Sequence, residues 1–262
     1  MIKQKPIWGR YELKNGMALE FTGGQASVII KRLTNGWMVS KTEQADISDK
    51  LLFEANDSFS HKGDEAIFQT GRSDILHVLP ALPVKPVVLR NYETIKISPK
   101  QTITLYLSIP VNVQFYYSQI DQHHLMTESE LQKLSDTWFG ETDTGEPAFS
   151  LGQRFSLRPE NLQVRKHEAL CPVKINNISN LLLELERLII RVENLSVYLK
   201  NDQLITSKVS IDYKGSDQIS NLHFSTDKTL HGEHPTLIAK PRNTVSTTIL
   251  GKSFHFIKHL TQ

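Results

Sequence analysis

The sequence predicts a mainly β protein with an antiparallel β-sandwich-like architecture in two β-rich halves, followed by a short C-terminal helix. One observation is the pair of dipeptides Asn15-Gly16 and Asn35-Gly36, each of which lies between two runs of strand-forming residues. Asn-Gly supplies the two positive φ angles of the type I′ turn that joins antiparallel strands. The other is the segment 102–109, in which every second residue is Ile or Leu. This period of two places the apolar residues on one face of a sheet.

The composition excludes several classes of protein. The chain has 262 residues, a formal net charge of +2 and a single cysteine, Cys171. So small a charge gives no strong field, and we expect no nucleic-acid partner. One cysteine allows no intramolecular disulfide, and we interpret Cys171 as a small apolar residue in a strand. No apolar run of about 18 residues and no secretory signal occur, so we expect a cytoplasmic protein that does not span a membrane.

Residues 1–122 are predicted to form an N-terminal antiparallel β domain. The two Asn-Gly hairpins are followed by a polar, loop-rich stretch at 43–72 and a strand near 75–79. The prolines of 80–86 cannot occupy a central strand, because proline lacks the N–H that the ladder requires. We expect an edge strand or a polyproline-like crossing segment there.

Residues 123–147 are predicted to form a connecting segment. Thr127 and Glu130 have the spacing of a capping box, which predicts a short helix. The Ser135–Gly140 segment and residues 140–147 are predicted to form loops.

Residues 148–240 are predicted to form a C-terminal β-sandwich-like domain. The run Leu181 to Leu195 fits both a helix face and a strand. We predict a strand, because asparagines bracket the run and hairpin-like segments surround it. Asn201-Asp202 predicts a tight turn between two further strands.

Residues 241–262 are predicted to form an amphipathic helix or a tail. Apolar residues recur at three- and four-residue spacings between Ile249 and Leu260, with lysines and histidines mostly off this stripe. Such a helix either covers an edge of its own sheet or acts as a tethered element that docks on a partner or lies on a membrane, and with only two lysines a protein partner is preferred.

Several segments together resemble one protein family. The most specific is Ser135-Asp136-Thr137-Trp138-Phe139-Gly140, and 80–88, 97–108, 176–179 and 195–198 accompany it. They resemble a prokaryotic domain of unknown function, family 432, over roughly residues 5–225. The family has no established activity, cofactor or catalytic residue, so the resemblance assigns no role to any position. Such proteins are sometimes encoded near mechanosensitive channels of small conductance, which makes a membrane channel a candidate partner.

The segment from Ser135 to Glu146 is the main candidate site. It combines carboxylates with two aromatic residues and two glycines, a set that suits a sugar or a cation; the candidate binding residues are Asp136, Trp138, Phe139, Glu141, Asp143 and Glu146. We favour a structural interpretation, an ordered connection between the two halves in which Trp138 and Phe139 are mostly buried as packing anchors and the acids are solvated.

Other candidate chemistry is weaker. His231 and His234 could contribute to a metal site, but a structural zinc site needs four ligands, and no cysteine or second histidine pair lies nearby in the sequence. No Gly-x-Ser-x-Gly elbow and no phosphate-binding loop occurs, and we expect no cofactor. We therefore predict a non-catalytic accessory or regulatory module that binds another protein. The alternative is a carbohydrate-binding protein or hydrolase that uses Asp136–Glu146.

Overall fold

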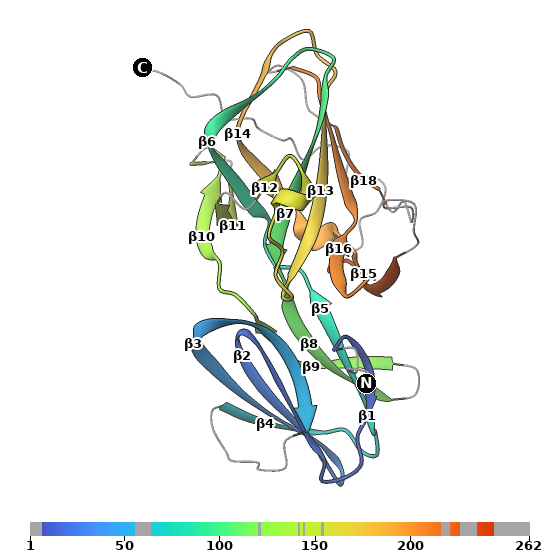
Figure 1. The fold of residues 1–262 in the computed structure, drawn as a ribbon. Helices are drawn as coiled ribbons and strands as arrows, with labels where there is room; N and C mark the ends of the chain where they lie inside the picture. The colour runs from blue at the N-terminus through green and yellow to red at the C-terminus, as the bar shows by residue number, and fades with distance from the viewer. Residues whose placement is uncertain are drawn as a thin grey trace. The chain divides into compact units, whose positions relative to one another are not determined.

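The structure is a computed structural model that describes residues 7–55, 64–119, 122–140, 142–143, 145–152, 155–215, 221–225 and 235–243. The described chain is mainly β, with several antiparallel sheets and two short 3-10 helices, η1 (Pro159–Asn161) and η2 (Val192–Asn194) (Figure 1). The predicted excess of strand over helix is confirmed. The C-terminal helix predicted within 241–262 lies, from residue 244 onward, outside the described residues. No helix of the described part has the length and apolar character needed to cross a membrane.

The chain divides into two compact units that interleave along the sequence. Unit 1 contains the described residues of Met1–Ala81, Pro110–Lys133 and Arg165–His167; unit 2 contains those of Leu82–Ile109, Leu134–Val164 and Glu168–Gln262. This division differs from the consecutive boundaries expected from the sequence. The cause is long-range pairing, because the strands of 87–110 pair with strands that follow residue 145.

Unit 1 contains two sheets. One has the order β1-β5-β8-β9 and the other β2-β3-β4. The strands are β1 (Gly9–Glu12), β2 (Ala18–Leu33), β3 (Gly36–Ala55), β4 (Asp64–Gln69), β5 (Ile75–Ala81), β8 (Asn112–Gln119) and β9 (Gln122–Glu130).

An aromatic cluster joins the two sheets of unit 1. Phe21 of β2 and Phe115 of β8 are fully buried, with 5.7 Å between ring centroids in an edge-to-face arrangement. Tyr11 of β1 meets Phe53 of β3 edge-on at 4.7 Å. Large aromatic side chains that interdigitate in this way supply much of the apolar burial of a small core. Burial also raises the pKa of Tyr11 to about 12.

The Asn-Gly dipeptides form turns, but only one of them joins a hairpin. β2 and β3 pair from Leu33 and Gly36 onward, so the connection is Thr34-Asn35, one residue before the predicted pair. Asn15-Gly16 lies in a turn closed by the Met17 N–H and the Lys14 carbonyl, at 3.0 Å. The strands on either side of it, β1 and β2, belong to different sheets. The hairpin predicted at Asn15-Gly16 is therefore wrong.

The short helix predicted in 123–147 is also wrong. Residues 122–130 form β9, which pairs with β8 along its length. Thr127 is buried opposite Phe115, and Glu130 lies opposite Asn112 in the same ladder, so the Thr-x-x-Glu spacing does not act as a helix cap here.

Unit 2 also contains two sheets. The first has the order β10-β11-β6-β14; the second has the order β12-β7-β13-β16-β15-β19, with β17 pairing to β13 and β18. The strands are β6 (Val87–Ile97), β7 (Thr102–Pro110), β10 (Ser135–Phe139), β11 (Glu146–Gly152), β12 (Phe155–Ser156), β13 (Glu168–Asn177), β14 (Leu183–Ile190), β15 (Val197–Lys200), β16 (Gln203–Thr206), β17 (Lys208–Tyr213), β18 (Asn221–Ser225) and β19 (Thr236–Ala239).

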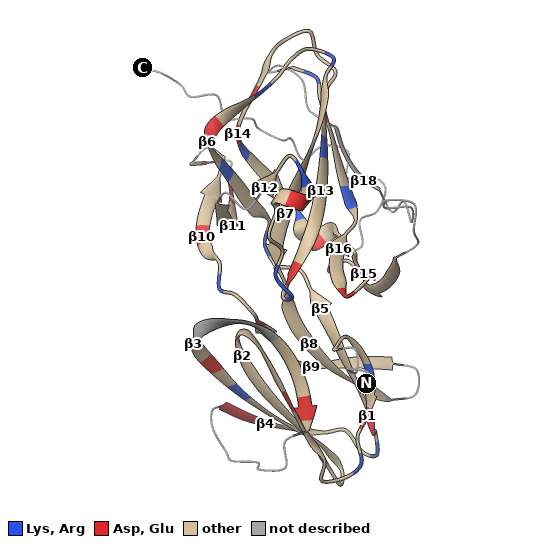
Figure 2. Ribbon diagram, in the orientation of Figure 1, with Lys and Arg blue, Asp and Glu red and all other residues tan. Residues whose placement is uncertain are grey.

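Pairing in unit 2 is mostly antiparallel, but β11 runs parallel to β6, and β13 runs parallel to both β16 and β17. The predicted strand within Leu181–Leu195 is confirmed as β14, which pairs antiparallel to β6. The predicted turn at Asn201-Asp202 joins β15 to β16, and both residues have positive φ, as a type I′ turn requires. Lysine, arginine, aspartate and glutamate are interspersed along the strands of both units (Figure 2).

Candidate functional site

The predicted site segment folds as a strand pair in unit 2 instead of a loop connection. β10 and β11 pair antiparallel from Ser135↔Ser150 to Phe139↔Glu146. Gly140, with φ of +108°, follows β10, and a Cβ at this position would lie 2.7 Å from the Cα of Gly145. Only glycine allows the two chain ends to approach so closely in this conformation. The glycines noted in the sequence therefore shape the turn.

Strand alternation divides the candidate residues between two faces of this pair. Side chains directly opposite each other in an antiparallel pair lie on one face, and successive side chains alternate. Trp138 opposes Pro147 and Asp136 opposes Phe149, so these four residues share a face. Phe139 opposes Glu146, and both lie on the other face.

The Phe139 face is buried and structural. Phe139 is 4% exposed, and the Arg187 guanidinium lies 5.4 Å from the centroid of its ring. Arg187 also donates to the Trp138 carbonyl at 2.9 Å, and burial, with a smaller effect from the nearby Arg90, lowers its pKa. Glu146 forms an ion pair with Arg191 at 2.6 Å. These contacts fasten β10 and β11 to β14 and the residue that follows it.

The opposite face carries what we call the Trp138 strip, made of Trp138, Pro147 and Phe149. The Trp138 side chain is 46% exposed, Pro147 is exposed and Phe149 is half-buried. Lys85 lies with its ammonium 4.8 Å from the centroid of the Phe149 ring and 2.7 Å from the Asp136 carboxylate. The strip is thus a partly exposed apolar surface bordered by an ion pair.

The expectation that both aromatic residues of this segment are buried is confirmed for Phe139 and wrong for Trp138. In a loop, as predicted for this segment, adjacent side chains can turn into the same core. In a strand, adjacent side chains point to opposite faces, so only one of the two enters the core. Asp143 is exposed in the turn, and Glu141 lies outside the described residues.

The arrangement does not support a carboxylate pair. Glycoside hydrolases place two carboxyl groups on either side of one bond, roughly 5–10 Å apart. Asp136 and Glu146 lie on opposite faces of the sheet, and each already has a cationic partner, Lys85 and Arg191 respectively. These two described carboxylates therefore have no common substrate position.

Metal and thiol chemistry find no support in the described part of the chain. His231 and His234 lie outside it, and within it no three His, Cys, Asp or Glu side chains gather as a metal site would require. Cys171 is fully buried in β13, and burial raises its thiol pKa to about 12. A thiol with so high a pKa is not a nucleophile at neutral pH, in agreement with its expected structural role.

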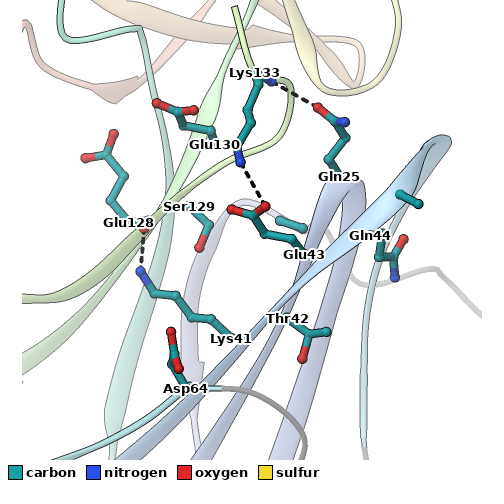
Figure 3. A pocket seen from close by; sticks show the side chains of 12 residues that line it. Gln25, Lys41, Thr42, Glu43, Gln44, Asp64, Glu128, Ser129, Glu130 and Lys133 are labelled. Carbon is teal, nitrogen blue, oxygen red and sulfur yellow. Dashed lines mark hydrogen bonds and ion pairs between the residues drawn. The ribbon is translucent and has the colours of Figure 1, made fainter.

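A cavity of about 720 Å³ in unit 1 was not predicted from the sequence (Figure 3). It lies between the β2–β3 hairpin and the chain around the end of β9, and no local motif marks it, because its walls come from strands far apart in the sequence. Its lining residues are Gln25, Ala26, Lys41, Thr42, Glu43, Gln44, Ala45, Asp64, Glu128, Ser129, Glu130 and Lys133.

The main charged groups of this cavity bind other protein groups. Lys133 pairs with Glu43 at 2.8 Å, and hydrogen bonding to Glu43 raises its pKa. Lys41 donates to the Glu128 carbonyl at 2.7 Å, while burial lowers its pKa. The Glu128 carboxylate accepts hydrogen bonds from Asn112 and Gln114. We therefore interpret the cavity as a polar junction between two sheets and assign no ligand to it.

Comparison with known proteins identifies the family of the chain but gives it no activity. Residues 7–258 match the model of a family described as protein of unknown function (DUF432), as the resemblance in the sequence had indicated. No curated protein and no solved structure matches the chain.

Proposed function

Because the chain belongs to the DUF432 family of proteins of unknown function, we propose a function from its geometry: it is a non-catalytic module, accessory or regulatory, that binds another protein through the Trp138 strip. The observation that carries this proposal is the 46% exposure of a tryptophan on an ordered strand pair. Tryptophan is enriched among the residues that dominate the energy of protein interfaces.

The surroundings of Trp138 suit such an interface. Pro147 lies directly opposite it and Phe149 follows on the same face, so the apolar surface extends along β11. The Asp136–Lys85 ion pair supplies a polar border, where charges add orientation more than affinity. The backbone beneath Trp138 is held by Arg187, so a partner would meet a preorganised ring.

Carbohydrate binding is the second candidate, and one observation favours it. Asp136 and Trp138 share a face of β10, and a ring beside a carboxylate can stack on a sugar and accept its hydroxyl hydrogen bonds. The Asp136 carboxylate already accepts a hydrogen bond from the Lys85 ammonium, which weakens this alternative. The opposite orientation of Glu146 weakens the hydrolase version further.

The test is a comparison of partner capture by the wild type and by Trp138→Ala. The protein is cross-linked in its host and purified from detergent-solubilised membranes as well as from the soluble fraction, because a membrane channel is one candidate partner. We expect one partner protein to be recovered with the wild type. Its recovery should fall by about 30-fold with Trp138→Ala, because truncation of an interface tryptophan weakens the free energy of binding by about 2 kcal/mol. Leu157→Ala, which alters a leucine that is 56% exposed elsewhere in unit 2, is the matched control.

Stability measurements separate binding from folding. Trp138→Ala should lower the free energy of unfolding by less than about 1 kcal/mol, whereas Phe139→Ala should lower it by about 3–5 kcal/mol, because Phe139 is buried. Recovery of the same partner with wild type and Trp138→Ala would refute the proposed surface. Binding to a glycan array that requires Trp138, without a protein partner, would establish the second candidate. Fractionation of the host tests the cytoplasmic location, which stays a prediction.

A further inference from the structure

A second exposed apolar surface lies in unit 2, in the loop that joins β13 to β14. Ile178, Leu181 and Leu182 are 44%, 55% and 47% exposed. Single exposed hydrophobic residues are common on proteins, but three within five consecutive residues form a patch. Pro99, in the neighbouring loop between β6 and β7, is also exposed. We call Ile178, Leu181 and Leu182 the apolar tip.

A buried hydrogen-bond network holds the apolar tip in place. The Asn177 side-chain nitrogen, in a residue that is 1% exposed, lies 2.8 Å from the Leu181 carbonyl and 2.9 Å from the Ile97 carbonyl. The Asn177 side-chain oxygen accepts from the Ser179 hydroxyl at 2.7 Å and from the Ser179 backbone N–H at 3.1 Å. These hydrogen bonds hold the backbone of the loop while its three large aliphatic side chains stay exposed.

Lysines border the tip. Lys100, on the β6–β7 loop, donates to the Ile178 carbonyl at 2.6 Å, which places its ammonium beside the apolar residues. Lys214 follows β17, whose last residue, Tyr213, accepts a hydrogen bond from the Ile178 N–H at 3.0 Å. Among the described residues, no ion pair joins either lysine to a carboxylate, whereas Lys96 nearby is paired with Glu184 at 3.3 Å. The two loops lie at the same end of unit 2 (Figure 1), and the hydrogen bond from Ile178 to Tyr213 places the end of β17 beside them.

We infer that the apolar tip inserts into the surface of a membrane that contains anionic lipid. Aliphatic side chains that enter the boundary between headgroups and acyl chains lose contact with water, while bordering lysines meet lipid phosphates. The residues that dominate the binding energy of a protein interface are enriched in Trp, Tyr and Arg, and leucine is under-represented among them. The tip contains only aliphatic residues with a basic border, so its chemistry fits a lipid surface better. This inference does not depend on the Trp138 strip.

Vesicle sedimentation with the full chain tests the inference. The vesicles contain either phosphatidylcholine alone or equal parts of phosphatidylcholine and phosphatidylglycerol. We expect binding to the mixed vesicles that weakens at high salt. The triple variant Ile178→Ser, Leu181→Ser, Leu182→Ser should bind at least about tenfold more weakly, because each aliphatic side chain that leaves water contributes favourably. Leu157→Ser, at a similarly exposed leucine outside the tip, should bind as the wild type does.

A second variant tests the basic border. Lys100→Gln with Lys214→Gln should weaken binding to the mixed vesicles by roughly 30-fold, because each of the two lysines near an anionic surface contributes about 1 kcal/mol. All variants should keep the wild-type melting temperature, since the altered side chains are largely outside the core. Absence of wild-type binding to the mixed vesicles would overturn the inference, and so would equal binding by the triple variant. Loss of a protein partner in the triple variant, without vesicle binding, would assign the tip to a protein and also overturn it.

Discussion

The residue that most changes the interpretation of the candidate site is Trp138. Its neighbour Phe139 was correctly expected in the core, yet a single step along a strand places the Trp138 side chain on the opposite face. The sequence could identify an aromatic, acidic segment, but it could not assign the faces until β10 was known to be a strand. The same alternation of side chains places Asp136 and Glu146 on opposite faces of the strand pair, which weakens the hydrolase alternative.

A pair of histidines in unit 1 permits a prediction about pH. His77 of β5 and His123 of β9 lie with ring centroids 4.4 Å apart. Burial, then the charge of His123 and then that of Arg10 lower the pKa of His77. His123→Gln should therefore raise the His77 pKa towards its ordinary value, as followed by the His77 Cε1 proton in an NMR titration. His124→Gln is the control, because His124 stacks on Tyr117 and does not contribute to the shift.

The sign of the linked stability effect follows from this shift. The unfolded state protonates His77 at its ordinary pKa, about 6.5, while the folded state resists protonation to lower pH. Acidification below about 6.5 therefore favours the unfolded state, and His77→Gln should reduce the loss of stability in that range. A His77 pKa that is unchanged by His123→Gln would contradict the electrostatic account.

At the scale of elements, local patterns predicted strands well and their partners poorly. The β14 strand and the Asn201-Asp202 turn were identified correctly from their immediate neighbours in the sequence. Pro80 lies in β5 beyond the last residue that pairs with β1, so only β8 pairs with β5 at this position. This agrees with the expected edge position of the proline. The β9 strand was mistaken for a helix because a capping-box spacing also occurs by chance in a strand. Neither the unit 1 cavity nor the Lys85 contact could be predicted, because both depend on the order of strands in space.

The crossing of β2 over the end of β9 provides a test of how two elements fit together. Gly24 lies at a β-bulge of β2 with φ of +56°, and a Cβ there would lie 1.9 Å from the Leu131 carbonyl oxygen. Gly71 has a similar φ of +70° and no atom within 4 Å of such a Cβ. Gly71→Ala should lower the free energy of unfolding by about 1–2 kcal/mol through its backbone conformation alone. Gly24→Ala should lower it by about 1–3 kcal/mol more, because β2 must move away from the Leu131 carbonyl.

Urea denaturation of both variants measures this difference directly. Equal loss of stability in Gly24→Ala and Gly71→Ala would show that β2 and the Leu131 carbonyl do not meet as closely as the structure places them.

For the whole molecule, the interleaved units indicate that residues 82–109 are an excursion between two strands that pair with each other. β5 ends at Ala81, which is the register partner of Asn112 in β8, yet β6 and β7 lie between them in the sequence and belong to unit 2. The pairing of β5 with β8 therefore does not require the intervening strands. A two-residue turn should be able to connect Ala81 to Asn112 directly.

This topology predicts that unit 1 folds alone once the excursion is removed. In a chain of residues 1–133 with 82–111 replaced by Asn-Gly, β5 and β8 become a hairpin, and β9 remains to pair with β8. The aromatic core between the two sheets is also retained, so we expect dispersed amide resonances and cooperative thermal unfolding. The fragment 1–122 is the comparison, because it lacks β9 and keeps β6 and β7 without the strands that pair with them in unit 2. Its unpaired apolar strands should make it aggregate. A well-folded 1–122 fragment beside an unfolded shortened chain would contradict the interleaved division and favour the consecutive domains expected from the sequence.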